Sequence, residues 1–135
     1  PADGETWPDS ISNWRDRHAQ LAIDLVLGNH DRQLANWLRE WRIEAHVEPM
    51  KINGLALFHE VATEAPVAGM SGHMHPVAWL RSGREKVRLP AFARRGDHLI
   101  LPAFGRFTGG FDGLDGKAWH LYPIVDHRVF ELPGR

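Results

Sequence analysis

The 135-residue sequence contains no cysteine, which excludes disulfide bonds and thiolate metal ligands. Any metal site must therefore use histidine, asparagine, aspartate or glutamate side chains. The sequence also has no apolar run of about 18 residues, so we expect no membrane-spanning helix. Hydrophobic residues make up 43% and charged residues 24% of the chain, a composition typical of soluble globular proteins. A cysteine-free chain of this kind fits the cytoplasm, and we expect it there.

The N-terminus lacks both an initiator methionine and a signal peptide. Residues 1–5 contain neither a basic segment nor an apolar stretch, and a signal peptide requires both. We therefore interpret Pro1 as a processed, trimmed or partial start. The length allows one domain with one core, and no repeat, low-complexity tract or interdomain linker divides the sequence.

The net charge of −1 conceals an uneven distribution of charge along the chain. Residues 1–64 carry 11 acidic and 6 basic residues, whereas residues 65–135 carry 6 acidic and 10 basic residues. Such a basic cluster could face a polyanion, or it could be a solvated strand face that protects a sheet edge from aggregation. The cluster consists of Arg81, Arg84, Lys86, Arg88, Arg94 and Arg95.

The pattern of apolar residues predicts a helix, a strand and a second helix, followed by a series of strands. We expect the first helix to begin at an N-cap formed by Asp9 or Ser10 and to end near residue 22. Residues 23–27 predict a buried strand that opens into a loop at Gly28, and Asp31 can cap the second helix. Further strands are expected at residues 52–58, 77–80, 86–92, 98–101, 122–125 and 128–132. This order favours a layered sheet core with helices outside.

Three segments place metal-binding side chains just beyond predicted strands: Gly28-Asn29-His30-Asp31, Phe58-His59-Glu60 and Gly72-His73-Met74-His75. Neutral imidazole is a common ligand for divalent ions, and asparagine offers a carbonyl oxygen. A His-x-His pair can hold one ion or reach two neighbouring ions. Strand ends at one edge of a sheet are where such loops converge. The remaining histidines are taken as ordinary surface or core residues: His18, His46, His98, His120 and His127.

These segments, in this order, resemble the calcineurin-like metallophosphoesterases. The Gly72–Pro76 segment, together with Leu101-Pro102-Ala103-Phe104-Gly105-Arg106-Phe107-Thr108-Gly109-Gly110, is most similar to the ligase-associated DNA-damage-response endonuclease branch, of PdeM type. The resemblance covers most of the chain. It implies an α/β fold, a layered α+β arrangement known as a four-layer αββα sandwich, here without its N-terminal strands. Residues 1–135 would then be the C-terminal portion of a single metallophosphoesterase domain.

The resemblance also implies roles for individual residues. Two divalent ions are expected, with manganese favoured over magnesium, iron or zinc; Asn29, His59 and His73 would bind one ion and His75 the other. His30 would stabilise or protonate the leaving oxygen, and Asp31 would hydrogen-bond His30 and fix its tautomer. The implied reaction is in-line attack of a metal-bound hydroxide on phosphorus at a dinuclear centre.

The Gly-Asp motif of that family is absent upstream of Gly28, and the Asp-x-His found there, Asp16-Arg17-His18, lies in the predicted first helix instead of after a strand. Without the carboxylates of these two motifs the remaining ligand set should bind hard divalent ions poorly. We therefore expect a fragment, completed by an N-terminal segment that carries both motifs on a separate chain, or by pairing with another copy in a homo-oligomer. The family resemblance further suggests association with DNA ligase or helicase repair machinery.

The substrate is the least constrained part of the prediction. Arg81, Arg84 and Arg106 are candidates for phosphate contacts, whereas the phenylalanines at 104, 107 and 111 could stack on bases or belong to the core. We expect a metal-dependent phosphodiesterase, a DNA endonuclease in DNA repair. Two alternatives stay open: a phosphatase for nucleotides or small phosphate esters, and a non-catalytic binding scaffold with a degraded metal site.

Overall fold

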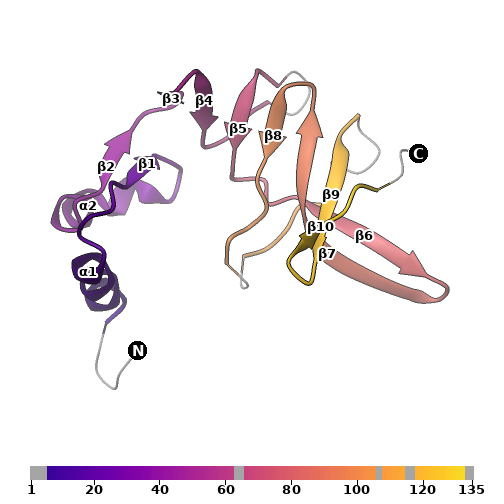
Figure 1. Ribbon diagram of the computed structural model, residues 1–135, viewed down its shortest axis with the longest axis horizontal. Helices are drawn as coiled ribbons and strands as arrows, with labels where there is room; N and C mark the ends of the chain where they lie inside the picture. The colour runs from indigo at the N-terminus through magenta and orange to yellow at the C-terminus, as the bar shows by residue number, and fades with distance from the viewer. Residues whose placement is uncertain (1–5, 63–65, 106–107, 115–117, 133–135) are drawn as a thin grey trace. The chain divides into compact units, whose positions relative to one another are not determined.

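A computed structural model describes residues 6–62, 66–105, 108–114 and 118–132 of the chain (Figure 1). It divides into two compact units, Pro1–Met50 and Lys51–Arg135. The single-domain organisation stays a prediction. None of the described helices is long and apolar enough to cross a membrane.

The first unit pairs two short parallel strands with two helices and one turn of 3-10 helix. Strand β1 pairs with β2, so that Asp24 lies opposite Glu44 and Val26 opposite His46. In chain order the elements are α1 (Trp7–Arg17), β1 (Asp24–Val26), η1 (Asp31–Gln33), α2 (Ala35–Glu40) and β2 (Glu44–His46). The second predicted helix is thus split, because the turn at Asp31 winds as a 3-10 helix before α2 begins.

Helix α1 begins earlier than predicted. Thr6 is the N-cap: its hydroxyl accepts a hydrogen bond from the Asp9 N–H at 3.4 Å, and the Asp9 carboxylate accepts one from the Thr6 N–H at 3.1 Å. This reciprocal capping box places Asp9 at the third helical position instead of the cap. The helix ends at Arg17 instead of near residue 22. The prediction chose the wrong polar residue because Asp9 and Ser10 are good caps in isolation.

The interior of the first unit is formed by aromatic rings and a buried arginine. Trp41 stacks on Trp37 with ring centroids 5.6 Å apart. Arg15 is only 2% exposed, and its guanidinium donates to the carbonyl oxygens of Trp41, His18 and Leu21 at 2.6, 3.0 and 3.2 Å. These bonds compensate the cost of burying the charge and connect the end of α1 to the residue that follows α2.

The second unit is built on an eight-stranded mixed sheet with the order β10-β9-β7-β8-β5-β4-β3, in which β6 also pairs with β7. Strands β4, β5 and β8 are parallel to one another, and β7 runs antiparallel to β6, β8 and β9 (Figure 1). The strands are β3 (Met50–Ile52), β4 (Leu55–Phe58), β5 (Gly69–Ser71), β6 (Val77–Ser82), β7 (Glu85–Arg95), β8 (His98–Ile100), β9 (His120–Val125) and β10 (Arg128–Val129). The mixed α+β class predicted from the sequence is confirmed.

Strand β5 lies between β4 and β8 but was predicted as loop. It is only three residues long and begins with Gly69, and both features weaken a strand pattern. The glycine is required there, because a β-carbon would overlap the carbonyl oxygen of Ala56 on the neighbouring strand. Strand β2 was missed for a related reason, since Glu44-Ala45-His46 offers no apolar alternation.

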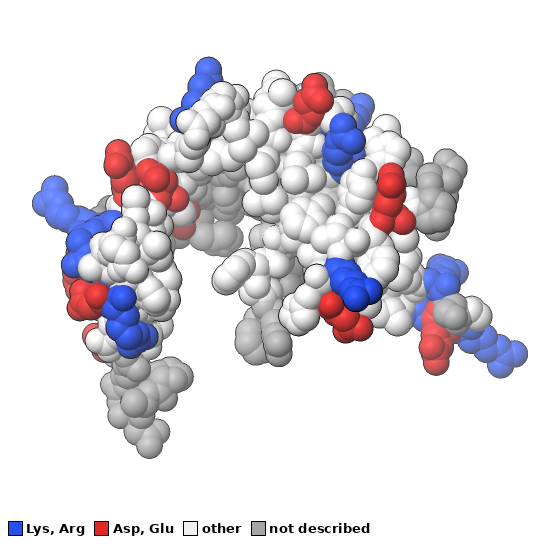
Figure 2. Space-filling model, in the orientation of Figure 1, with Lys and Arg blue, Asp and Glu red and all other residues white. Residues whose placement is uncertain are grey.

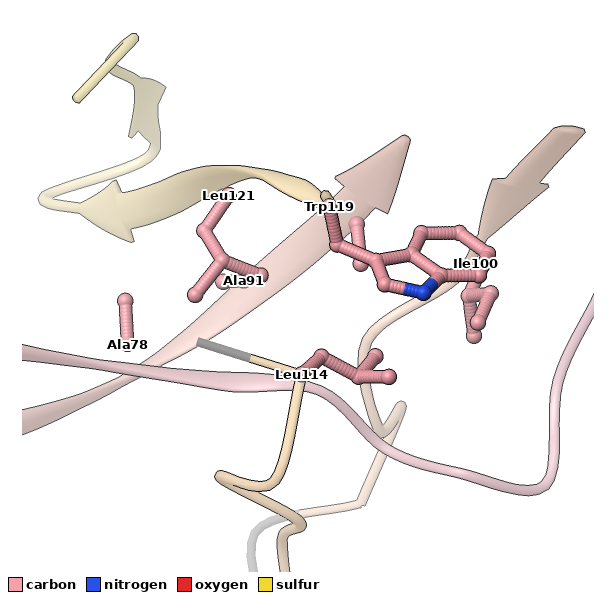
Figure 3. Close-up of a cluster of buried hydrophobic side chains, with 7 residues drawn as sticks. Ala78, Ala91, Ile100, Leu114, Trp119 and Leu121 are labelled. Atoms are coloured by element: carbon pink, nitrogen blue, oxygen red, sulfur yellow. The ribbon is translucent and has the colours of Figure 1, made fainter. Parts of the chain in front are cut away.

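The core of the second unit lies over β7. Ala91, Ala93 and Ile100 are fully buried, and the indole of Trp119 lies alongside Ile100 (Figure 3). The small alanine side chains leave room for the larger residues that cover the strand, including Leu121. Burying each large apolar side chain contributes about 1.5–3 kcal/mol. This packing fixes the sheet whose strand ends position the site.

Candidate functional site

Two predicted ligands lie side by side at the carboxyl ends of adjacent parallel strands. His59 directly follows β4, and His73 follows β5 after Gly72. The register pairs Phe58 with Ser71, and the Gly72 N–H donates to the His59 carbonyl at 3.2 Å. The rings of His59 and His73 therefore meet edge to face, with centroids 4.6 Å apart and planes at 65°.

The third predicted ligand, His75, belongs to the same cluster. Burial lowers the pKa of His75, and positive charge on His73 and on His59 would lower it further. His75 is thus near enough to His73 and His59 for charge on either ring to affect its protonation. Since a lowered pKa favours the neutral ring, which is the form that binds metal, the cluster is electrostatically suited to hold a cation.

The backbone of the His-x-His segment is strained. His73 and His75 both adopt the left-handed conformation, with φ of 58° and 49°, which costs about 1–2 kcal/mol for each L-residue. Hydrogen bonds hold the segment in place: the Met74 N–H donates to the Gly72 carbonyl at 2.7 Å, and the Phe111 N–H donates to the His75 carbonyl at 3.0 Å. Strain of this kind is concentrated at functional sites.

A carboxylate that the sequence analysis gave no role also borders the cluster. Glu60 Oε2 lies 3.6 Å from His73 Nε2, and the Glu60 side chain is about half exposed. The sequence signal that could have identified Glu60 is its position immediately after His59, at the end of β4. Glu60 could supply an oxygen donor beside the imidazoles.

The other predicted residues, Asn29, His30 and Asp31, lie on one turn of the first unit. The Asp31 carboxylate accepts a hydrogen bond from the Gly28 N–H at 2.8 Å, and the Asp31 N–H donates to the Gly28 carbonyl at 3.3 Å. The contact of the carboxylate is thus with Gly28, whereas the prediction assigned it to His30. Asn29 and His30 are exposed, and their approach to the three imidazoles stays a prediction.

A second group of donor atoms in the first unit was not predicted. Donor atoms of Asp24, Glu44 and His46 all lie within 4.8 Å of one another. His46 Nε2 is 2.7 Å from Asp24 Oδ1 and 4.0 Å from Glu44 Oε1. The parallel register of β1 and β2 brings the three together, although Asp24 lies 22 residues before His46 in the sequence. The group could hold a divalent ion, and without one it is an ordinary surface ion pair.

Arg81, Arg84, Lys86 and Arg88 are exposed on the β6–β7 hairpin, where Arg81 pairs with Lys86. Blue side chains gather at this hairpin in Figure 2. The Lys86 ammonium lies 3.7 Å from the centroid of the Trp79 ring, a cation–π contact. The Arg88 guanidinium donates to the Gly110 carbonyl. Arg106, a predicted phosphate contact, and Phe107 lie outside the described residues.

His75 lines a groove with a volume of about 480 Å³. Its lining also includes Arg88, Leu89 and Pro90 from β7 and Ala103, Phe104 and Gly105 from the loop after Leu101. On that loop Phe104 is fully exposed. The cluster therefore opens into a recess that combines a cation, apolar walls and an aromatic ring.

Comparison with known proteins gives one informative similarity. No family model matches the sequence, and no curated protein matches it. Among solved structures, the chain is similar to the nuclease MPE of Pseudomonas putida, with 36% sequence identity and a TM-score of 0.75 over 91% of this chain. The chain spans 59% of the length of that nuclease, and over this span it shares the fold of the nuclease.

Proposed function

We propose that the chain forms part of a metal-dependent nuclease that hydrolyses phosphodiester bonds, with DNA as the substrate. The observation that carries the proposal is the cluster of His59, His73 and His75 at the carboxyl ends of β4 and β5. Its strained His-x-His backbone supports the proposal, and so does the similarity to a nuclease.

The donor chemistry of the cluster fits divalent ions. Imidazole nitrogen suits borderline ions such as iron and zinc, and carboxylate oxygen suits manganese and magnesium. Glu60 adds such an oxygen near His73. We propose two ions, with manganese favoured: Asn29, His59 and His73 would hold one, and His75 the other. When bound, the ions would activate water and neutralise charge on the phosphoryl oxygens.

The remaining residues would position the substrate and manage the proton. His30 would stand at the leaving oxygen, as a stabiliser of its charge or as the general acid. Asp31 closes the turn through Gly28 and would thereby fix the backbone that presents Asn29 and His30. In this role Asp31 is a positioning residue and does not touch the substrate.

The proposal includes a complementary segment. The chain spans 59% of the similar nuclease, has no Gly-Asp before Gly28, and carries its Asp-x-His, Asp16-Arg17-His18, at the end of α1 and not after a strand. We propose that a segment carrying these motifs supplies the missing carboxylates. DNA-repair partners such as a ligase or a helicase belong to the same proposal.

The test uses the chain together with the proposed upstream segment, supplied with Mn²⁺ and supercoiled plasmid. We expect nicking by the wild type, loss of bound manganese and of nicking in His73→Ala, and loss of nicking with metal retained in His30→Ala. The matched control is His120→Ala, since His120 is an exposed histidine on β9. Metal retention and full nicking by His73→Ala would overturn the metal centre. A wild type that binds metal but cleaves no phosphate ester would favour a scaffold.

A further inference from the structure

The groove beside His75 has the dimensions and chemistry of a binding site for one nucleotide. Its volume of about 480 Å³ lies within the range of small-ligand pockets. Because His75 is one of the residues that line it, whatever occupies the groove lies next to His75. A substrate cleaved at the cluster would therefore extend into this groove.

The guanidinium of Arg88 is held in the groove by its surroundings. It donates to the Gly110 carbonyl, and a β-carbon on Gly110 would overlap both this guanidinium and Val77. The missing side chain at Gly110 thus makes space for Arg88. One hydrogen bond occupies one of the five N–H donors of an arginine, and Arg88 is exposed, so donors are available for a phosphate. The hydrogen bond from the Trp79 indole lowers the pKa of Asp112, with a smaller contribution from the charge of Arg88, and the Asp112 carboxylate offsets part of the charge of Arg88.

The loop after Leu101, which also lines the groove, presents an aromatic ring to solvent. Phe104 is fully exposed, an arrangement that leaves a large apolar surface in water and is unfavourable unless something covers it. Leu89 and Pro90 face the same groove from β7. A ligand with a flat ring system and a nearby negative charge could cover Phe104 with its ring and pair its charge with Arg88. A nucleotide has both features.

We propose that Phe104 and Arg88 form a subsite for the nucleotide that flanks the scissile phosphate, with its base stacked on Phe104 and its phosphate against Arg88. The inference rests on the proposed function, which supplies the cleavage next to His75. A base inside a duplex is already stacked on its neighbours, so the nucleotide in this subsite is unpaired. Phe104 is then a substrate-binding residue that favours unpaired nucleotides.

The test removes the base and the ring separately. A single-stranded oligodeoxynucleotide and the same oligodeoxynucleotide with abasic residues around the cleavage position are cleaved by wild type, Phe104→Ala and Phe104→Trp, all with the upstream segment and Mn²⁺. We expect the wild type to have a KM about tenfold lower for the base-bearing strand, within the range of one base–aromatic stack. Phe104→Ala should raise that KM to the abasic value, whereas Phe104→Trp should keep the preference.

The outcomes separate this inference from the proposed function. If the wild type cleaves neither strand, the nuclease proposal fails. If the wild type cleaves both strands and Phe104→Ala leaves the preference for the base intact, the nuclease proposal stands and the subsite is wrong. The same conclusion about the subsite follows if Phe104→Ala slows both strands equally. The role of Arg88 is tested by Arg88→Gln, which should weaken binding of both strands. The slope of the logarithm of the binding constant against the logarithm of the salt concentration should become smaller by about one.

Discussion

His98 Nε2 lies 3.0 Å from the Ser71 hydroxyl in the interior of the sheet. The Nδ1 atom of the same ring contacts the Val67 carbonyl. A carbonyl can only accept, so Nδ1 carries the hydrogen and Nε2 accepts from the Ser71 hydroxyl. His98 on β8 thereby fixes the chain on both sides of Gly69 and Met70, and Ser71 is the last residue before the loop that carries His73 and His75.

We predict that His98→Leu destabilises the second unit by about 1–3 kcal/mol, because it leaves the Ser71 hydroxyl and the Val67 carbonyl without a partner. Denaturant unfolding measures the loss. The matched control is His120→Leu, where the histidine is exposed and the change should stay within about 0.5 kcal/mol. Equal stability of the two variants would show that the buried bonds contribute nothing.

Because the backbone at His75 is left-handed, we predict that glycine is tolerated at this position better than alanine. In the presence of chelator, His75→Gly should be more stable than His75→Ala by about 1 kcal/mol, because glycine adopts a φ of 49° without the steric cost that alanine pays. Both variants remove the imidazole, so their difference isolates the backbone. An alanine variant as stable as the glycine variant would mean that the segment relaxes when the side chain is removed.

At Gly69 the neighbouring strand leaves no space for a side chain. Gly69→Ala should destabilise the fold by more than about 1 kcal/mol, because the residue has a φ of 148° and a β-carbon would overlap the Ala56 carbonyl and the Phe58 ring. Gly109→Ala is the control, as a β-carbon at Gly109 meets no atom within 4 Å. Thermal unfolding of both variants checks the prediction, and a stable Gly69→Ala would refute the close packing of β4 against β5.

The proximity of His59 and His73 was expected from the order of the motifs and from the family resemblance. His59 follows a predicted strand, whereas β5, the parallel neighbour that carries His73 at the same edge, was predicted as loop. The group of Asp24, Glu44 and His46 could not be predicted, because it depends on the register of two strands, one of which has no strand pattern.

The buried position of His98 could not be predicted from the sequence either. A sequence gives no indication that one histidine among nine lies between a carbonyl and a hydroxyl from the neighbouring strand. The predicted meeting of Asn29 with the imidazoles depends on the arrangement of the two units, and it stays a prediction. Long strands such as β7 were found readily, since their β-rich residues extend over many positions.

The lowered pKa of His75 predicts how stability depends on pH. Burial is the main cause, followed by repulsion from His73 and His59, so the folded state binds the proton on His75 more weakly than the unfolded state, whose pKa is near 6.5. As pH falls below this value, the unfolded state takes up protons first and the fold loses stability; the loss is complete once pH is below the folded pKa. Above pH 7.5 His75 is neutral in both states, and its contribution to the pH dependence disappears.

Unfolding of wild type and His75→Gln in chelator, compared from about pH 8 down to about pH 5, measures this contribution. Glutamine has no proton to bind in this range, so the stability of the wild type should fall relative to that of His75→Gln as the pH decreases through the window just below 6.5. Parallel curves for wild type and His75→Gln would contradict the lowered pKa, and with it the electrostatic coupling that joins His75 to the other two imidazoles.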